Sequence, residues 1–594
     1  MAYLSQTFTR TASTLGRVLR NRQLVLFILG LATGAIAAGA SIGFREMIAL
    51  VQTVALGFGS ERVASFAAQQ PWWRILLAPV AGGLLIGLFI RYVLPNGRPQ
   101  GVPHVMEAVA LRAGRIHFRT GIAAAVASAA SIGCGASVGR EGPVVHLGAA
   151  LSSSLARRLH LSRGLTLTLL GCGVASAIAA SFNAPIAGVF FALEVVVGHY
   201  ALSSFAPIVI ASVTGTIITR LYYGNAPAFE IPPRMIASFL EFPAFALLGI
   251  VSAFIAVAFI KGTALVEDNI GRVPVPDWTR PGIAGLAVGV AAIWYPQVLG
   301  VGYEVTDAAL AEKLTLGMLV ALFVLKFALS ALCLGAGFSG GVFSPALVMG
   351  ALAGGAFGLV AGGAFPHLSS GPGAYAIVGM GAVAGAILGA PISTILIIFE
   401  LTSNFTLTIA VMIGVVIASV ITQQVAGKSF FVVQLERRGI SLAGGRETSL
   451  LRSRKVADIL RSDFERIAAD LPMPEVRARL QADPHGELFV VDADGSGRLA
   501  GTITLQDLGD AAFDTARDGE LSAARVARLS PPALTLDADL EDARRMIETA
   551  GEDQVAVVAD TESLRLVGCV HARDVMQAYQ SALLQARAEE RGEA

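Results

Sequence analysis

The amino-acid sequence predicts an all-α membrane protein that crosses the bilayer many times, followed by a soluble α/β domain. The 594 residues are 54% hydrophobic and 15% charged and include 65 glycines, and the mean hydropathy is +0.66. Such a composition excludes an ordinary soluble protein. Apolar stretches follow one another from Leu24 to about Ala426, whereas after Lys428 charged residues become frequent and apolar runs shorten to strand length. We therefore expect two regions with different folds.

The membrane region is preceded by an arginine-rich segment, residues 1–23, which we expect on the cytoplasmic side. The apolar run that starts at Leu24 is long enough to stay in the bilayer, so no cleavable signal is predicted. The net charge of +1 gives no global basic field for nucleic acid. The cysteines have no close spacing, and buried free thiols are expected at Cys134, Cys172, Cys333 and Cys569.

The apolar stretches of the membrane region are not all simple helical spans. Several are shorter than the roughly 20 residues that a span needs, and several are interrupted by Gly or Pro. Non-helical backbone inside a membrane needs protein or a water-filled cavity around it, so we predict half-helices that meet inside the protein. The stretches are residues 24–58, 74–95, 121–138, 143–156, 165–198, 204–222, 238–265, 282–300, 314–335, 343–366, 374–400 and 407–426.

The run from Gly139 to Pro143 places two opposite charges, Arg140 and Glu141, inside an apolar segment. An ionisable side chain at membrane depth costs about 2.5 to 3.5 kcal/mol, so it normally faces a protein interior or a water path. Pro143 disfavours helix for the residue before it and is suited to open a new helix. The free N–H groups and positive dipole end of that helix favour an anion. Glu141 is the carboxylate placed to occupy such a site when no external anion does.

Two parts of the membrane region share the same order of landmarks. Ala-Pro-Ile occurs around Pro185 and again around Pro391, and each proline is followed by a glutamate at the same spacing, Glu194 and Glu400. Paired interrupted helices in two halves indicate a transporter whose binding site lies between the halves. Upstream, each half also has a proline that opens an apolar helix after a glycine-rich loop, Pro143 in the first and Pro345 in the second.

The soluble region also repeats itself. Residues 487–492 and 501–507 have counterparts in residues 554–559 and 568–574. Each unit is expected to fold as strand, turn, strand and helix. Two arginines beside the last apolar stretch place this region on the cytoplasmic side. The predicted divisions are a membrane domain at 24–435, a linker at 436–452, two soluble units at 453–515 and 522–582, and a charged tail at 583–594.

These motifs resemble the CLC family of chloride channels and proton-coupled chloride transporters, followed by a pair of CBS modules. The three anion-site signatures of that family occur in order: Gly101-Val102-Pro103 matches the end of the first, residues 139–143 match the second, and residues 341–345 match the third. The resemblance implies a CLC-like fold built from inverted halves in a lipid bilayer. It also implies a homodimer with one anion pathway per subunit. We expect a bacterial inner membrane, with both termini cytoplasmic.

The resemblance implies a functional site as well. In the family, the glutamate that matches Glu141 is the gate: its carboxylate competes with chloride and swings away on protonation. A buried ion pair between Glu141 and Arg140 is the alternative interpretation. The substrate would be chloride or another small anion, and no cofactor is implied. The residues implied in anion binding are Gln100, Gly101, Gly139, Arg140, Gly142, Val342, Phe343 and Phe431.

The residue after Glu194 bears on whether protons move with the anion. Family antiporters usually have an inner proton-relaying glutamate at this position, where the sequence has Val195. Valine accepts no proton, and family channels commonly show the same Glu-Val pair, so we expect a passive chloride channel. The alternative is a chloride/proton antiporter with a rerouted proton path. If the match to the family pattern is shifted by one residue, Glu194 takes the place of the proton-relaying glutamate. Its repeat partner Glu400 instead favours the interpretation of Glu194 as a structural, hydrogen-bonded carboxylate.

Two departures from the family pattern bear on selectivity and the inner gate. Gln100 stands where serine is common, and its amide donates hydrogen bonds but is longer than a serine hydroxyl. Phe431 stands where tyrosine is usual, and it obstructs a pore without offering an O–H donor. These changes leave open a transporter that handles protons by water. The fluoride-selective branch is disfavoured because it alters the second signature, which is intact here.

In the CBS pair, Thr504 with Asp507 and His571 with Asp574 stand at the strand-to-helix turn where family members hold a ribose. Two expectations therefore stay open. The CBS pair binds an adenine nucleotide at Thr504, Asp507 and Asp574, or it binds no nucleotide. A CBS-linked divalent-cation transporter is disfavoured because the membrane carboxylates are scattered. An enzyme is disfavoured because no nucleophile-base pair or metal-ligand cluster stands out in the apolar region.

Overall fold

The computed structural model describes residues 22–225, 229, 231–232, 236–440, 454–513, 515–516 and 518–591. The chain divides into two compact units, one up to Leu442 and one from Ala443. Three expected segments fall partly outside the described residues. The parts that lie outside are residues 1–21 of the N-terminal segment, residues 441–452 of the linker and residues 592–594 of the tail.

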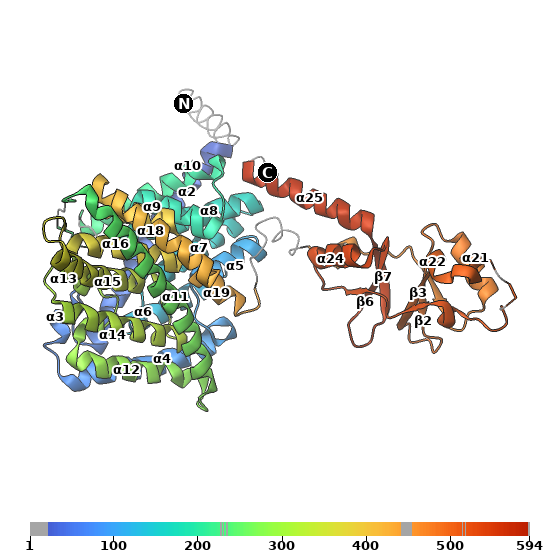
Figure 1. Ribbon diagram of the computed structural model, residues 1–594, viewed down its shortest axis with the longest axis horizontal. Helices are drawn as coiled ribbons and strands as arrows, with labels where there is room; N and C mark the ends of the chain where they lie inside the picture. The colour runs from blue at the N-terminus through green and yellow to red at the C-terminus, as the bar shows by residue number, and fades with distance from the viewer. Residues whose placement is uncertain are drawn as a thin grey trace, which may run out of the picture. The chain divides into compact units, whose positions relative to one another are not determined.

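The first unit consists of packed helices, coloured from blue to orange in Figure 1. Eight of the described helices are long and apolar enough to cross a membrane, and five shorter apolar helices accompany them. The predicted multi-span helical fold is therefore confirmed. The helices are α2 (Arg22–Ala55), α3 (Val63–Ala67), α4 (Trp72–Val93), α5 (Val102–Leu111), α6 (Phe118–Gly133), α7 (Glu141–Arg158), α8 (Arg163–Phe182), α9 (Pro185–Phe191), η2 (Ala192–Val197), α10 (Leu202–Tyr223), α11 (Phe242–Arg272), α12 (Arg280–Trp294), α13 (Tyr303–Leu310), α14 (Leu316–Gly335), α15 (Phe343–Ala364), α16 (Pro372–Leu388), α17 (Pro391–Thr402), α18 (Phe405–Ala426) and α19 (Phe430–Glu436). Short 3-10 turns lie at Pro95–Gly97, Phe239–Glu241, Asp277–Thr279 and Pro296–Val298.

Glycine lets the helices of this unit approach closely. A methyl group added to Gly350 of α15 would stand 2.3 Å from the carbonyl oxygen of Gly379 in α16. One added to Gly354 would stand 2.2 Å from the carbonyl oxygen of Tyr375. Small residues permit this contact in a membrane, where helix association depends on close packing. A similar packing joins α4 to α12, which lie side by side in Figure 1.

The two halves of the unit have the same order of elements. In the first half α8 ends at Phe182 and α9 begins at Pro185, and in the second half α16 ends at Leu388 and α17 begins at Pro391. The helices that follow, α10 and α18, each have 22 residues. The predicted repeat of broken helices is therefore present in the structure.

The two halves also cap each other's broken helices. Glu194, at the end of the first broken segment, accepts the backbone N–H groups of Ile392 at 3.1 Å and Ser393 at 2.8 Å. Glu400, at the equivalent place in the second half, accepts the N–H groups of the second and third residues of α9 at 2.9 and 2.8 Å. These amides have no partner inside their own helices. Both glutamates therefore have the hydrogen bonds of structural carboxylates.

Replacing Glu400 with alanine is expected to lower the free energy of unfolding by about 3 to 6 kcal/mol, because each hydrogen bond to a charged group contributes about 1.5 to 3 kcal/mol. Thermal inactivation of the purified protein in detergent measures the effect. Glu194→Ala should cost at least as much, because Glu194 also accepts the hydroxyl of Ser393. Glu436→Ala is the control, because Glu436 forms a partly exposed ion pair with Lys428, which is worth about 0 to 1 kcal/mol. Equal losses in all three variants would contradict the reciprocal capping role.

The second unit has two small mixed sheets, each flanked by helices. In the first sheet β2 pairs parallel with β1 and antiparallel with β3. In the second, β6 pairs parallel with β5 and antiparallel with β7. Each half of this unit therefore contains the predicted strand, turn, strand and helix, and one further strand precedes them in the chain. The strands are β1 (Glu465–Ala468), β2 (Glu487–Val491), β3 (Leu499–Thr504), β4 (Arg528–Leu529), β5 (Ala533–Thr535), β6 (Gln554–Val558) and β7 (Leu566–His571). The helices are η6 (Val456–Ile459), α21 (Met473–Ala482), α22 (Leu505–Leu508), η7 (Gly509–Ala512), α23 (Ala523–Val526), α24 (Leu540–Ala550) and α25 (Ala572–Arg591).

The two sheets share an apolar interface. Phe489 and Leu499 of the first sheet form one buried cluster with Ala556, Val558 and Cys569 of the second. Each sheet also has its own core against its helices. Buried apolar area is the main favourable term in such packing, so the two halves of the second unit form a single folded pair.

Candidate functional site

A cavity of about 600 Å³ lies inside the first unit. Its walls include the N-terminal residues of α5, α7 and α15 together with part of α19. Each of these three helices has a proline in its first turn, Pro103, Pro143 and Pro345. The first N–H groups of a helix have no partner within it, and this end carries a partial positive charge. Three such ends around one cavity favour an anion inside it.

Two of these helices begin earlier than the sequence predicts. α7 begins at Glu141 rather than at Pro143, and α15 begins at Phe343 rather than at Pro345. The prediction that the prolines open these helices was wrong by two residues. A proline in the third helical position costs no intrahelical hydrogen bond, because the first four N–H groups of a helix have no partner within it. Glu141 is therefore in the first turn of α7, at the positive end of the helix dipole.

The second and third signatures meet at a short backbone pairing. Gly139 and Gly341 form an antiparallel bridge in which each N–H donates to the other residue's carbonyl at 2.7 Å. A methyl group at Gly341 would stand 2.9 Å from the nitrogen of Gly142, and one at Gly139 would stand 3.0 Å from the carbonyl oxygen of Gly341. The two halves therefore touch here because these positions are glycine.

Glu141 is held at the cavity wall by two side-chain hydroxyl groups. Its side chain is only 1% exposed. One carboxylate oxygen, Oε1, accepts a hydrogen bond from the Tyr303 hydroxyl at 2.7 Å. The other, Oε2, accepts a hydrogen bond from the Ser344 hydroxyl. Tyr303 begins α13 and Ser344 lies in the first turn of α15, so residues from two other helices fix this carboxylate.

Arg140 pairs with a more distant glutamate rather than with its neighbour. Its Nη1 atom lies 2.5 Å from Oε1 of Glu61, and Arg45 binds the other oxygen of Glu61 at 2.8 Å. The Nε atom of Arg140 is 3.9 Å from Oε1 of Glu141, and its guanidinium lies 4.6 Å from the centre of the Tyr303 ring. The alternative interpretation, in which Glu141 mainly serves as the ion partner of Arg140, is therefore disfavoured.

Most of the predicted anion-site residues line the cavity. Gly139 and Arg140 are not among the described lining residues. Gly139 supports the wall through its bridge to Gly341, and the Arg140 guanidinium is bound to Glu61, so any contribution of Arg140 to an anion falls to its backbone N–H. The predicted residues that line the cavity are Gln100, Gly101, Glu141, Gly142, Val342, Phe343 and Phe431.

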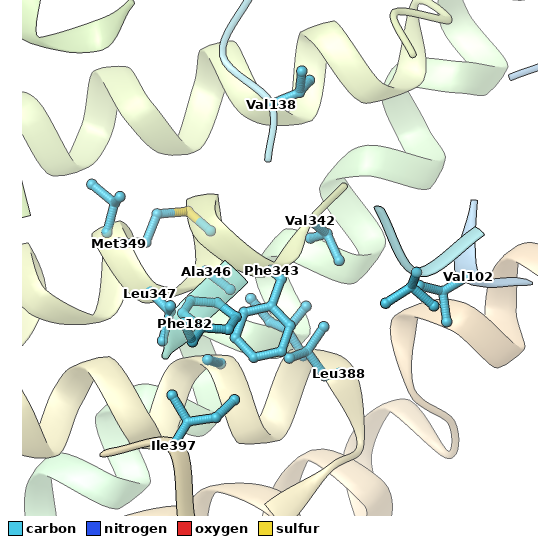
Figure 2. Packing of buried hydrophobic residues seen from close by; sticks show 14 of the residues in the cluster. Val102, Val138, Phe182, Val342, Phe343, Ala346, Leu347, Met349, Leu388 and Ile397 are labelled. Atoms are coloured by element: carbon cyan, nitrogen blue, oxygen red, sulfur yellow. The ribbon is translucent and has the colours of Figure 1, made fainter. Parts of the chain in front are cut away.

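Aromatic packing fixes the start of α15. The ring of Phe343 lies 5.1 Å from that of Phe182 and 5.9 Å from that of Phe191, measured between ring centres. Figure 2 shows Phe343 facing Phe182, with Leu388 beside them. Because the ring is packed against neighbours from the first half, the backbone N–H groups at this helix start are held in place at the cavity.

The wall formed by α5 and α19 contains the two residues that depart from the family pattern. The amide nitrogen of Gln100 donates to the carbonyl of Arg98 at 3.3 Å. Phe431 is 4% exposed and contacts the ring of Phe430. Neither arrangement supplies a hydroxyl donor to the cavity.

Few carboxylates reach the cavity. Among the described residues, those that line it are Glu141, Glu267 and Asp277. Val195 is buried within η2, and the neighbouring Glu194 is bound to the amides of α17. Glu267 also pairs with Arg437, whose Nε atom lies 3.1 Å away. Val195, the residue after Glu194, therefore offers no proton acceptor at this point of η2.

The predicted nucleotide residues lie at equivalent places in the two halves of the second unit. The Asp507 carboxylate accepts the backbone N–H and the hydroxyl of Thr504, both at 2.8 Å. Asp574, at the start of α25, is bound by Arg461 at 2.8 and 3.3 Å. The side chains proposed for a ribose therefore bind each other or a neighbouring arginine.

Glu487 is a buried carboxylate at the start of β2 and is 5% exposed. Burial raises its pKa from an ordinary 4.5 to about 8, and the nearby Glu552 carboxylate adds to the rise. Between these two values the folded form holds a proton that the unfolded chain has lost. The stability of the second unit should therefore fall as the pH rises from about 4.5 to about 8.

Glu487→Gln should remove this pH dependence, because glutamine has no proton to lose. For the wild-type segment 443–594 we expect the melting temperature to drop by about 10 °C between pH 5 and pH 8 from this group, measured by circular dichroism. Position 554 of the second half, which matches position 487, is already glutamine. Gln554→Glu should therefore add a second pH-dependent loss. An identical pH profile for wild type and Glu487→Gln would refute the assignment.

Three residues of the site were missed in the sequence analysis: Tyr303, Ser344 and Glu61. Ser344 lies inside the third signature, so its position was visible, although its bond to Glu141 was not. Tyr303 is 162 residues from Glu141, and Glu61 is 79 residues from Arg140. No local pattern marks such distant contacts.

Comparison with protein families gives two matches. Residues 82–423 match the family described as voltage gated chloride channel. Residues 456–513 and 523–581 each match the CBS domain. Together the matches cover both units of the structure.

Individual relatives and solved structures agree with these matches. A putative chloride channel protein ClcB-like from Ralstonia nicotianae is 32% identical over 70% of this chain and 97% of the relative. An H(+)/Cl(-) exchange transporter ClcA from Cronobacter sakazakii is 30% identical over 72% of this chain and 93% of the relative. A slow cyanobacterial Cl-/H+ antiporter has a similar fold over 70% of this chain and 97% of its own, with a TM-score of 0.63 at 22% identity. A eukaryotic CLC transporter covers 92% of this chain and 97% of its own, with a TM-score of 0.60 at 20% identity.

Proposed function

This chain belongs to the CLC family of chloride channels and transporters and has two C-terminal CBS domains, and on that premise we propose that it is a passive chloride channel gated by Glu141. The protein is an integral multi-pass membrane protein that transports anions, and it is not an enzyme. The observation that carries the proposal is the buried carboxylate of Glu141. It lines a cavity of about 600 Å³ at the N-terminal ends of three helices.

The gate would work by competition between two anions. With its charge in place, the Glu141 carboxylate takes up the positive end of α7 and is held by Tyr303 and Ser344. Each bond to the charged group contributes about 1.5 to 3 kcal/mol, which favours the closed position. Protonation removes the charge and weakens both bonds, so the side chain can leave and chloride can take its place.

The passive nature of the flux rests on the lack of an inner proton acceptor. Val195 occupies the position where family antiporters usually have a glutamate. Glu194 is bound to two backbone N–H groups and to the hydroxyl of Ser393, which holds its side chain in one position. A proton that reaches Glu141 from one side therefore has no family-type relay to the other side.

A chloride/proton antiporter is the second candidate. One observation favours it: Glu267 lines the same cavity as Glu141, so an alternative route for a proton starts with a carboxylate already in place. A relative at 30% identity is named an exchange transporter. In this candidate, Glu267→Gln would abolish proton movement while leaving chloride flux.

The deciding experiment is anion flux from chloride-loaded proteoliposomes, with the external pH recorded at the same time and charge balanced by a potassium ionophore. Chloride efflux without linked proton movement is expected. Proton movement in fixed proportion to chloride would overturn the channel proposal in favour of the antiporter. A protein that passes no anion under either condition would contradict both.

We propose four further assignments, of which the homodimer rests on the family resemblance and the placement of the termini on the arginines that flank the membrane region. They are a homodimer, cytoplasmic placement of both termini, a bacterial inner membrane, and the domain divisions 24–435, 453–515 and 522–582. The mass of the detergent-solubilised protein, corrected for detergent, should be twice the 61.5 kDa of one chain. Adenine nucleotide at Thr504, Asp507 and Asp574 is tested by thermal stabilisation of the protein with ATP, ADP or AMP.

A further inference from the structure

Three side chains that bind transition metals come together in the second unit. Asp463 lies in the stretch before β1, His485 in the loop before β2, and His571 at the end of β7. One potential ligand atom from each lies within 4.8 Å of the others. The group has no part in the anion pathway described above, and the family matches assign no metal to it.

The limit of 4.8 Å between the ligand atoms is wider than the spacing around a bound metal. The imidazole rings of His485 and His571 have their centres 4.4 Å apart and are inclined by 53°. Ligand atoms around a tetrahedral Zn²⁺, at about 2.0 to 2.2 Å from the ion, are roughly 3.3 to 3.6 Å from each other. His485 and Asp463 are exposed, so small side-chain rotations bring the three atoms to these separations.

The backbone around the three side chains is held by the fold. Asp483 accepts the N–H of His485 at 3.0 Å and that of Glu487 at 3.2 Å, which fixes the loop before β2. Arg461 forms an antiparallel backbone bridge with Cys569 of β7, which ties the stretch before β1 to the strand that ends in His571. A site built on such supported segments loses less entropy on binding an ion.

The charges nearby also suit a cation. Arg461, the nearest cation in sequence to Asp463, is bound by both oxygens of Asp574. The ion pair neutralises its charge. The remaining donors are two imidazoles and one carboxylate, a set that suits Zn²⁺ and related ions better than Mg²⁺ or Ca²⁺, which prefer all-oxygen sites.

We propose that Asp463, His485 and His571 form a Zn²⁺ site between the two CBS halves. Three protein ligands leave one position of a tetrahedral ion for water. Asp463 and His485 come from the first half and His571 from the second, so the ion links the halves beside their shared apolar interface. The proposal does not depend on whether the membrane unit is a channel or an antiporter.

The test uses the tag-free, full-length protein in detergent. It is stripped with a chelator and then dialysed against micromolar ZnCl₂, and bound metal is measured by mass spectrometry. The wild type should bind one more Zn²⁺ per chain than His485→Ala. Competition with a zinc-binding dye should show at least about 100-fold weaker binding in His485→Ala and in Asp463→Asn, because loss of a direct ligand exceeds the 10- to 100-fold cost of losing an outer-shell partner. His367→Ala, which removes an exposed histidine of the first unit, should bind as the wild type does.

Co²⁺ gives a second readout of the ligand set. The wild type and His367→Ala should develop the visible absorption of four-coordinate Co²⁺, and the two ligand variants should not. His485 is an exposed loop residue, so its loss should not unfold the domain, and an unchanged gel-filtration profile checks this. Equal Zn²⁺ affinity in the wild type, His485→Ala and Asp463→Asn would overturn the proposal, as would a wild type that binds no Zn²⁺ at micromolar concentration.

Discussion

Glu141→Ala is expected to raise chloride flux at neutral pH at least about tenfold and to remove its dependence on pH. In the proposed gating mechanism, the variant lacks the carboxylate that competes with the anion at the start of α7, together with both hydrogen bonds that hold it there. Two bonds to a charged group, at about 1.5 to 3 kcal/mol each, correspond to at least a hundredfold bias toward the closed position. Flux from proteoliposomes at pH 5 and pH 7.5 measures both effects.

Two further variants sharpen this result. Glu141→Gln mimics the protonated side chain and should behave like the alanine variant, with somewhat lower flux because of its size. Glu304→Ala is the matched control: Glu304 is the residue after Tyr303, but its carboxylate binds Ser65. It should leave the pH dependence intact. A pH-dependent flux in Glu141→Ala equal to that of the wild type would show that another group is the gate.

Tyr303→Phe is expected to raise flux at neutral pH by about tenfold or more, because it removes one hydrogen bond of about 1.5 to 3 kcal/mol from the closed carboxylate. Phenylalanine keeps the ring that lies under the guanidinium of Arg140, so the pairing of Arg140 with Glu61 should survive. The flux assay described for Glu141 measures the change.

Combination with a second variant tests whether the hydroxyl groups act on the same carboxylate. Ser344→Ala should also raise flux, and Tyr303→Phe with Ser344→Ala should approach the flux of Glu141→Ala. Tyr375→Phe is the control, because Tyr375 is buried between α15 and α11 and does not line the cavity. Adding either hydroxyl variant to Glu141→Ala should have no further effect. If it does, the hydroxyl acts elsewhere.

The sequence predicted the fold well where local chemistry decides it. Hydropathy marks the long helices, and the prolines at 185 and 391 mark the breaks, since proline removes a backbone donor and fixes its own φ angle. It missed the exact starts of α7 and α15, because proline is tolerated anywhere in the first turn. It also missed α3 and α13, which have five and eight residues and are too short to give a periodic signal.

The site was predictable only in part for a related reason. The glycines and Glu141 form a local motif, so the sequence pointed to them. The bridge between Gly139 and Gly341 and the bond from Tyr303 to Glu141 join residues that are far apart in the chain. Which residues meet across a fold is set by packing of all its helices, and a single sequence carries no local signal for it.

The reciprocal capping of α9 and α17 also has a consequence for the order in which the protein is made. The N–H of Ile186 finds its partner in Glu400, 214 residues later. At about 5 to 20 residues per second, roughly 10 to 40 s pass between the synthesis of the two. During that time the first half is in the membrane with the amides of a broken helix still uncapped. The first half therefore reaches its final form only after the second half has emerged, and a chain that ends before Glu400 leaves both the helix and the anion cavity unfinished.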